Sequence, residues 1–298
     1  MSRAVPFVQA DIFTTRPFAG NPAGAILDAD GLAEADMRAL AAELRLPGLA
    51  FVARPTTPAA EFRLRYLTPA REVTYSGHTT LGAVHTLLEA GRIKPGTTRF
   101  ETGAGLLAVT VETAGAAPVM WLGPPLLPLR PLAMPLEPLL AALGLGRADL
   151  GAWAAPAVTG DTDLLLPIAG LGPLRALRPD MPALAAAAEN QGLRGVCVVS
   201  RETVEPGSAT HCRVFIPHFG IPEDIVTGSV HSPMGLWLAE AGVLPLDAGR
   251  AAFRGEQGDT VGRPGRLRVE VEGAGGAAPR VRVGGTAVTV LSGSLRLP

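Results

Sequence analysis

The chain has 298 residues, a formal net charge of −1 and 47% hydrophobic residues. This length and apolar content favour a globular protein with one large domain or two smaller ones, each able to bury a core. Because neither sign of charge forms a long run, the sequence predicts neither nucleic acid nor an anionic membrane surface as a partner, and a small molecule is favoured instead.

The first half of the chain predicts strands with two helices among them. A turn at Gly20-Asn21-Pro22 is expected between the first two strands, because an Asn before a Pro leaves the helical region of backbone space. Apolar spacing predicts one amphipathic helix, and strict alternation predicts the strand that precedes the second helix. The predicted strands are 5–13, 23–27, 61–67, 100–113 and 119–122, and the predicted helices are 36–46 and 79–89.

The proline-rich piece 123–135 is the predicted linker, because repeated prolines favour an extended chain. The domains expected on either side are residues 1–122 and 136–298, and the C-terminal strand is allowed to return to the first domain. No strand–helix–strand alternation and no phosphate-binding glycine loop is recognised, so a Rossmann fold is not predicted. The elements expected in the second half are helices at 136–145 and 181–190 and from about 228, and strands at 162–168, 195–199, 212–216 and within 267–297.

The two halves carry the same local pattern. Gly77-His78-Thr79-Thr80 opens a predicted helix that closes at Glu89-Ala90-Gly91, and Gly228-Ser229-Val230-His231 opens one that closes at Glu240-Ala241-Gly242 with the same spacing. We interpret the pattern as an ancient duplication. A helix start leaves about four backbone N–H groups without an intrahelical acceptor and carries the positive end of the helix dipole. Two such starts are therefore expected to hold a small anion from both sides of one cleft.

Cysteine usage and the N-terminal residues indicate an intracellular protein. Cys197 and Cys212 each lie in an apolar run typical of a strand, which favours buried free thiols over a disulfide or a catalytic pair. Residues 1–13 lack the apolar core of a signal peptide. The apolar stretch 118–145 is interrupted by prolines and charged residues, which argues against a membrane span. A cytoplasmic location is expected.

The chain resembles the PhzF family, phenazine-biosynthesis-like isomerases with the diaminopimelate epimerase fold. The resemblance implies an α+β protein of two similar domains, each a curled, mostly antiparallel sheet around a central helix. It further implies a homodimer that moves a proton on a small anionic metabolite without metal or organic cofactor. The segments that carry it are Asp11-Ile12-Phe13 to Phe18-Ala19-Gly20-Asn21-Pro22, Thr68-Pro69 to Ser76-Gly77-His78-Thr79-Thr80-Leu81-Gly82, Gly220-Ile221-Pro222-Glu223-Asp224 to Val226-Thr227-Gly228-Ser229-Val230-His231, and Gln257-Gly258 to Gly262-Arg263-Pro264-Gly265-Arg266-Leu267.

The resemblance implies two catalytic residues. His78 is expected as a proton relay or substrate donor, and Asp224 as the residue that orients the substrate or the histidine. Each also has a structural interpretation: a residue of the first helical turn for His78, and an Asx turn toward Val226 for Asp224. The substrate-binding residues expected are Gly77, Thr227, Gly228, Ser229 and Asn21, although helix capping would explain the glycines and Ser229, and a turn would explain Asn21. His211, His218 and His231 lack the spacing of a metal site, so no metal is predicted.

One departure from the family concerns the general base. In PhzF-like enzymes this base is a glutamate in a Ser-Glu-Thr type segment ahead of a Phe-Val strand. The aligned residues here are Leu46-Pro47-Gly48-Leu49-Ala50-Phe51-Val52, so the glutamate's position falls on Gly48. A general base contributes about a hundredfold to ten-thousandfold in rate. Glu43 is the alternative candidate for a relocated base, but its helical spacing favours a solvated position.

Pro233 is a second departure, because it falls within the first turns of the second central helix. Either the helix starts at Ser232, with Pro233 in its first position, or Ser229 caps it and Pro233 removes one internal hydrogen bond. Two functions therefore stay open. The chain is either an isomerase whose proton transfer falls to His78 and Asp224, or a catalytically impaired relative that binds a metabolite or serves as an accessory protein.

Overall fold

The computed structural model describes residues 4–113, 115–124, 128–273 and 279–297. The chain divides into two compact units. Unit 1 contains residues 1–123 and 284–298, and unit 2 contains residues 124–283. Within the predicted linker, residues 125–127 lie outside the described residues, while Arg130–Pro131 forms the short strand β9 of unit 2. Across the described chain, no helix has both the length and the apolar character that crossing a membrane requires.

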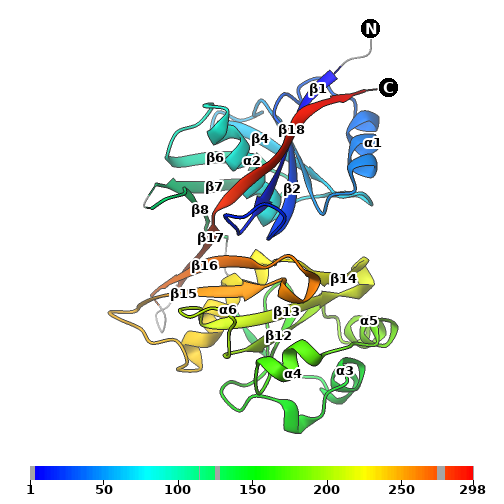
Figure 1. Cartoon of the computed structure of the whole chain (residues 1–298), viewed down its shortest axis with the longest axis vertical. Helices are drawn as coiled ribbons and strands as arrows, with labels where there is room; N and C mark the ends of the chain where they lie inside the picture. Colours follow the sequence, from blue (N-terminus) through cyan, green and yellow to red (C-terminus); the bar gives the residue numbers. More distant parts are fainter. Residues whose placement is uncertain (1–3, 114, 125–127, 274–278, 298) are drawn as a thin grey trace. The chain divides into compact units, whose positions relative to one another are not determined.

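Unit 1 is a mixed sheet with two helices. The last strand of the chain, β18, pairs antiparallel with the first strand, β1, so both ends of the sequence meet in this unit (Figure 1). The elements of unit 1 are β1 (Ala4–Ile12), β2 (Asn21–Ile26), α1 (Glu34–Leu44), β3 (Leu49–Ala53), β4 (Phe62–Leu67), β5 (Glu72–Val73), α2 (Gly77–Glu89), β6 (Gly96–Thr102), β7 (Gly105–Glu112), β8 (Val119–Leu122) and β18 (Ala287–Arg296).

The helix α2 is the centre of unit 1. It contacts β1, β2, β3, β8 and β18, and most of its side chains are buried. The helix α1 covers the other side of the strands, where Met37, Leu40 and Ala41 pack with Leu49 and Phe51. Strands β2 and β3 are thus buried on both faces, which explains why they read as continuous apolar runs without alternation.

Unit 2 is also a mixed sheet, with helices on both faces of its central strands. On β12, Val196 and Val198 pack into the core under α3, α4 and α5, while Cys197 and Val199 face the opposite side. The elements of unit 2 are β9 (Arg130–Pro131), α3 (Glu137–Leu143), β10 (Ala157–Val158), β11 (Asp163–Pro167), α4 (Leu171–Ala176), α5 (Met181–Asn190), β12 (Gly195–Ser200), β13 (Thr210–Ile216), β14 (Ile221–Asp224), α6 (Gly228–Glu240), β15 (Arg250–Gln257), β16 (Gly265–Glu272) and β17 (Arg280–Gly285), whose last residues belong to unit 1.

The order of strand pairings is the same in both units. In unit 1, β1–β2 is antiparallel, β2–β3 parallel, β3–β4 antiparallel, β4–β6 parallel and β6–β7 antiparallel. In unit 2, the pairs β10–β11, β11–β12, β12–β13, β13–β15 and β15–β16 follow the same alternation. The helices α2 and α6 occupy the same place in this order, which supports the interpretation as a duplication.

The two central helices also end alike. Each is followed by an alanine with right-handed helical angles, Ala90 at φ −74° and Ala241 at φ −75°. The next residue in each case is a left-handed glycine, Gly91 at φ 68° and Gly242 at φ 67°. A glycine is favoured there because a Cβ atom strains this conformation. The shared Glu-Ala-Gly pattern is therefore a helix stop used twice.

Three sequence-based expectations about the fold were wrong. The parallel pairs β2–β3 and β11–β12 are each bridged by helices, so strand–helix–strand units do occur. Asn21 does not lie in a turn: it begins β2, opposite Ile12, and is fully buried. The helix α6 is not capped by Ser232 or Ser229, because it starts at Gly228 with Thr227 as N-cap and contains Pro233 in its interior.

Candidate functional site

The start of α2 carries a short chain of hydroxyl and imidazole groups. Ser76 is the N-cap residue, with extended backbone angles, but its side chain makes no hydrogen bond to the backbone amides of the first turn. Its Oγ lies instead 2.7 Å from Thr79 Oγ1, which in turn lies 3.3 Å from Nε2 of His78. The amides that a serine cap normally occupies are therefore not taken up by this cap.

Two further hydroxyl groups, those of Thr80 and Tyr66, hold this helix start against the core of unit 1. Thr80 Oγ1 donates to the backbone oxygen of Ser76 at 2.8 Å, and Tyr66 Oη lies 2.8 Å from Thr80 Oγ1. Since the Thr80 hydrogen is already used, Tyr66 must be the donor. Burial raises the pKa of Tyr66, so its hydroxyl stays protonated and able to donate at neutral pH. The position of Ser76 is thus fixed by the core of unit 1.

Gly48 is buried directly against this helix start. A Cβ atom built on Gly48 would lie 2.0 Å from Thr79 Oγ1, which is closer than real Cβ atoms approach another atom, and 3.1 Å from Thr79 Cβ, which is a tight contact. The position that resemblance assigns to a glutamate therefore has no room for any side chain while Thr79 keeps its present rotamer. Glu43, by contrast, is exposed on α1, in agreement with the solvated position expected from its spacing.

The start of α6 has the same arrangement with different partners. Thr227 is the N-cap, and it too makes no side-chain hydrogen bond to the first helical amides. Its Oγ1 donates to Asp224 Oδ2 at 2.5 Å, while the amide of Ile225 donates to Asp224 Oδ1 at 2.9 Å. Asp224 is therefore tied to its own loop through Ile225 and Thr227.

The side chain of Gln257 locks this loop to the sheet. Its Oε1 accepts from the amide of Thr227 at 3.0 Å. Its Nε2 donates to the backbone oxygen of Asp224 at 2.8 Å and to Thr227 Oγ1 at 3.1 Å. Gln257 is fully buried at the end of β15, so all three bonds are shielded from water. Such a satisfied buried amide defines the position of the helix entry.

A cation lies beside the second residue of α6. Arg194 Nη2 donates to Ser229 Oγ at 3.2 Å, and the same guanidinium forms an ion pair with the buried carboxylate of Asp163. Gly228 and Ser229 are half-exposed. The helix dipole and the nearby guanidinium both favour an anion at this point, although Asp163 already balances much of the arginine charge.

Behind the same helix entry lies a buried thiol–imidazole cluster. His231 Nδ1 lies 3.0 Å from the backbone oxygen of Thr227, and His231 Nε2 lies 3.6 Å from Cys212 Sγ. Both cysteines are buried and free, as predicted. Burial opposes ionisation of Cys212, but its contacts with Cys197 and His231 outweigh burial and lower its pKa below the usual thiol value. Because Cys212 and His231 are fully buried, we assign the cluster a structural role, which is to hold the start of α6 in place.

The structure thus gathers the predicted residues into two groups. His78 and Gly77 lie at the start of α2 in unit 1, and Asp224, Thr227, Gly228 and Ser229 lie at the start of α6 in unit 2. Asn21 lies in β2, one of the strands against which α2 packs. Sequence reasoning missed the residues that hold these groups in place, namely Ser76, Thr79, Arg194 and Gln257. Only Ser76 had a local signal, as a serine directly before the helix.

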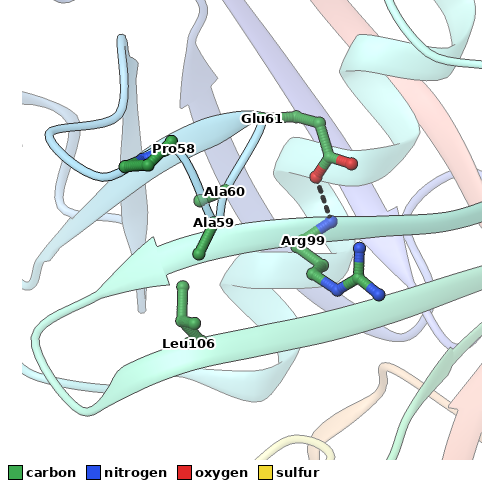
Figure 2. Close-up of a pocket in the computed structure, with 6 residues that line it drawn as sticks. All are labelled: Pro58, Ala59, Ala60, Glu61, Arg99 and Leu106. Carbon is green, nitrogen blue, oxygen red and sulfur yellow. Dashed lines mark hydrogen bonds between the residues drawn. The ribbon is translucent and has the colours of Figure 1, made fainter.

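Two surface hollows of unit 1 lie elsewhere. One, of about 330 Å³, is lined by Pro58, Ala59, Ala60, Glu61, Arg99 and Leu106, and Figure 2 shows these residues on the segment 58–61 and on the hairpin of β6 and β7. Its Glu61 carboxylate accepts from the amide of Arg99 at 2.5 Å. The other, of about 400 Å³, runs along 92–98. Neither is lined by a predicted site residue, so we do not assign the reaction to them.

Comparison with known proteins gives the family. The model of the phenazine biosynthesis-like (PhzC-PhzF) proteins matches residues 10–293. The chain belongs to this family. An uncharacterised isomerase of Deinococcus radiodurans is 36% identical to this PhzF-family chain over 292 residues, covering 96% of the chain and 93% of the relative.

Solved structures agree with this assignment. A PhzF-family protein of Bacillus anthracis superposes with a TM-score of 0.90 at 26% identity, covering 98% of this chain and 99% of the other. A hydroxyproline epimerase of Agrobacterium vitis superposes with a TM-score of 0.58 at 12% identity, covering 99% of this chain and 93% of the other, a likeness of fold alone. The predicted α+β fold of this PhzF-family member is therefore confirmed.

Proposed function

We propose that the protein is a PhzF-like isomerase or epimerase that moves a proton on a small carboxylate-bearing metabolite. The observation that carries the proposal is the shared arrangement of the two helix entries. In both, a Ser or Thr cap turns its hydroxyl away from the first helical amides and toward a group that transfers or orients protons: the Ser76 hydroxyl reaches His78 through Thr79, and the Thr227 hydroxyl reaches Asp224 directly. Fixed amide donors suit a carboxylate whose negative charge grows in the transition state.

In the proposed reaction, the backbone amides at a helix entry bind the substrate carboxylate, and those at Gly77 are the ones beside His78. His78 takes the proton from the carbon next to the carboxylate, and the electron pair of that bond is delocalised into the carboxylate. The imidazolium then returns the proton to another face or another carbon, so that nothing is oxidised or reduced. Asp224 is the second catalytic residue that the family resemblance implies, and it contributes negative charge.

A second candidate is a metabolite-binding protein without catalysis. The specific observation in its favour is the contact between Gly48 and Thr79, because the position ahead of β3 where the resemblance implies a glutamate base has no room for one while Thr79 keeps its present rotamer. The amide donors of both helix entries serve binding equally well. The two candidates differ in one measurable property, which is exchange of a substrate proton with solvent.

The test is solvent deuterium incorporation into carboxylates incubated with the protein in D₂O. The panel includes L-proline, a cyclohexadiene carboxylate and trans-4-hydroxy-L-proline, which is bound in the hydroxyproline epimerase structure. Incorporation that disappears in His78→Ala and Asp224→Asn supports the isomerase. Binding without incorporation by the natural protein supports the second candidate. Absence of both binding and exchange across the panel contradicts the two candidates together.

A further inference from the structure

Thr227 is expected from the family resemblance to bind substrate, yet the structure directs its polar groups toward the protein. The residue is buried, and its Oγ1 contacts Asp224 Oδ2 at 2.5 Å and Gln257 Nε2 at 3.1 Å. Its backbone amide donates to Gln257 Oε1 at 3.0 Å. A carboxylate accepts hydrogen bonds and therefore needs donors. Both donors of Thr227, the hydroxyl and the amide, are already taken up by Asp224 and Gln257.

The orientation of the Gln257 amide follows from its backbone partners. The backbone N–H of Thr227 can only donate, so the atom that faces it is Oε1. The backbone oxygen of Asp224 can only accept, so the atom that faces it, at 2.8 Å, is Nε2. An amide nitrogen carries two hydrogens, and the second one of Nε2 is donated to Thr227 Oγ1. The fully buried Gln257 side chain is therefore held in one orientation.

The direction of the Thr227 hydroxyl follows in turn. Because Oγ1 accepts from Gln257, the hydroxyl hydrogen points away from that amide and toward Asp224 Oδ2. The distance of 2.5 Å is typical of a hydroxyl that donates to a carboxylate. The other oxygen, Asp224 Oδ1, accepts from the amide of Ile225 at 2.9 Å. Each oxygen of Asp224 thus has one donor from its own loop, and the two bonds together fix the plane of the carboxylate.

We infer that Thr227 and Gln257 are positioning residues for Asp224, and that the Thr227 side chain does not hold the substrate carboxylate. Gln257 sets the direction of the Thr227 hydroxyl, and this hydroxyl sets the orientation of the Asp224 carboxylate. The inference rests on the proposed function for its effect on the reaction rate, but the chain of hydrogen bonds is a property of the free protein. Orientation matters because a misplacement of about 1 Å can cost about a hundredfold in rate.

The first experiment measures the chain of hydrogen bonds without substrate. The ¹³C carboxyl resonance of Asp224, identified by its loss in Asp224→Asn, responds to the hydrogen bonds that the two oxygens accept. We expect it to be alike in the natural protein and in Thr227→Ser, which keeps the hydroxyl. We expect it to shift in Thr227→Val, which keeps the shape without the hydroxyl, and in Gln257→Met, which has no donor. The same resonance in all four proteins overturns the inference, and a shift in Thr227→Val alone overturns the role of Gln257.

The second experiment separates positioning from substrate binding by the concentration dependence of deuterium incorporation. Thr227→Val and Gln257→Met are expected to lower the maximal rate by about tenfold to a hundredfold. The half-saturating carboxylate concentration is expected to stay within about twofold of that of the natural protein, because no donor to the substrate is lost. Thr227→Ser is expected to restore most of the rate. A raised half-saturating concentration with an unchanged maximal rate in Thr227→Val would show that Thr227 binds the substrate, which overturns the inference.

Thermal unfolding of each variant separates a loss of positioning from a loss of folding. If Gln257→Met does not fold, the side-chain ¹⁵N–¹H resonances of Gln257 decide its part. The hydrogen that faces Thr227 Oγ1 is expected to shift in Thr227→Val and not in Thr227→Ser, and an unchanged resonance in both overturns the contact. If no carboxylate of the panel exchanges, the proposed function fails, while the ¹³C measurement still decides whether Thr227 and Gln257 position Asp224.

Discussion

Thr227 Oγ1 donates a hydrogen bond of 2.5 Å to Asp224 Oδ2, so the cap of α6 is tied directly to the acidic residue ahead of the helix. The other Asp224 oxygen accepts from the amide of Ile225. Asp224 therefore shapes the helix entry through its oxygens, and this structural role must be separated from the catalytic role that we propose for its negative charge. An amide side chain keeps an acceptor oxygen but removes the charge.

Asp224→Asn is therefore expected to lower deuterium incorporation by about a hundredfold or more, while the free energy of unfolding changes by less than about 1 kcal/mol. Asp224→Ala removes both acceptors and is expected to cost about 1–3 kcal/mol as well as the exchange. Urea unfolding and the exchange assay on both variants test this. Equal exchange in Asp224→Asn and the natural protein would leave the residue with a structural role only.

Placing at position 48 the glutamate that the family resemblance implies requires two substitutions. Gly48→Glu alone is expected to unfold the first turn of α2 or lower stability by about 1–3 kcal/mol, because its Cβ meets Thr79 Oγ1 at 2.0 Å. Gly48→Glu with Thr79→Gly removes that contact, and it is expected to recover most of the lost stability. Thermal unfolding of the two proteins measures the difference. A single Gly48→Glu variant as stable as the natural protein would contradict the steric argument.

Gln257 is expected to be the most sensitive single position of the α6 entry. Gln257→Glu replaces the donor Nε2 by a second acceptor, which leaves Thr227 Oγ1 and the Asp224 carbonyl without their donor and buries a charge. The expected cost is about 2–4 kcal/mol in the free energy of unfolding. Gln191→Ala, which loses one hydrogen bond to Pro135, is the matched control and is expected to cost about 1 kcal/mol or less. Similar losses in the free energy of unfolding for the two variants would refute the claim that Gln257 is the most sensitive position of the α6 entry.

Acid stability is expected to depend on Glu256. Burial raises the pKa of this carboxyl, but hydrogen bonds from His211 and from the amides of Val204 and Glu205 outweigh burial and lower its pKa to about 2. The folded protein is therefore stabilised by the ionised form above the unfolded pKa of about 4.3, and this stabilisation is lost as pH falls toward 2. The shift corresponds to about 3 kcal/mol.

Glu256→Gln removes this titration. The free energy of unfolding of the natural protein is expected to fall more steeply than that of the variant between pH 4.5 and 2, in the range set by the folded and unfolded pKa values. Urea titrations at a series of pH values give both slopes. If the free energy of unfolding of the two proteins falls equally with pH, Glu256 is not the source of the pH dependence.

The repeated helix stops give a test of the duplication. Gly91→Ala and Gly242→Ala are each expected to cost about 1 kcal/mol, because both positions have left-handed angles while no neighbouring atom obstructs a Cβ. Gly172→Ala in α4, where the space is also open but the angles are ordinary, is expected to be neutral or slightly stabilising. A clear difference in cost between Gly91 and Gly242 would indicate that the two stops are not equivalent.

Local patterns were enough to predict most elements of the fold. The helix 181–190 is confirmed with its predicted bounds, and Asp180 caps it by accepting from the amide of Ala183, a signal within the sequence itself. The strand β15 was missed because its sequence does not alternate, and it is held by pairing with β13 and β16. What local sequence could not show was which distant residues meet.

The candidate site illustrates the same limit. The glycine-led helix entries and His78 were visible as motifs, but Gln257 reaches Thr227 only because β15 pairs with β13. The contact between Gly48 and Thr79 likewise depends on how α2 packs on β3. The family resemblance implies a glutamate at position 48, and the structure shows that Thr79 occupies the space beside Gly48.

The central claim is that the helix entry at Gly77 holds the carboxylate on which His78 acts. The most direct measurement is a titration with a carboxylate that exchanges, following the backbone amide resonance of Gly77 by ¹H–¹⁵N NMR. We predict that this resonance shifts and saturates with a stoichiometry of one carboxylate per chain. An unshifted Gly77 resonance at carboxylate concentrations that saturate the exchange would contradict the account.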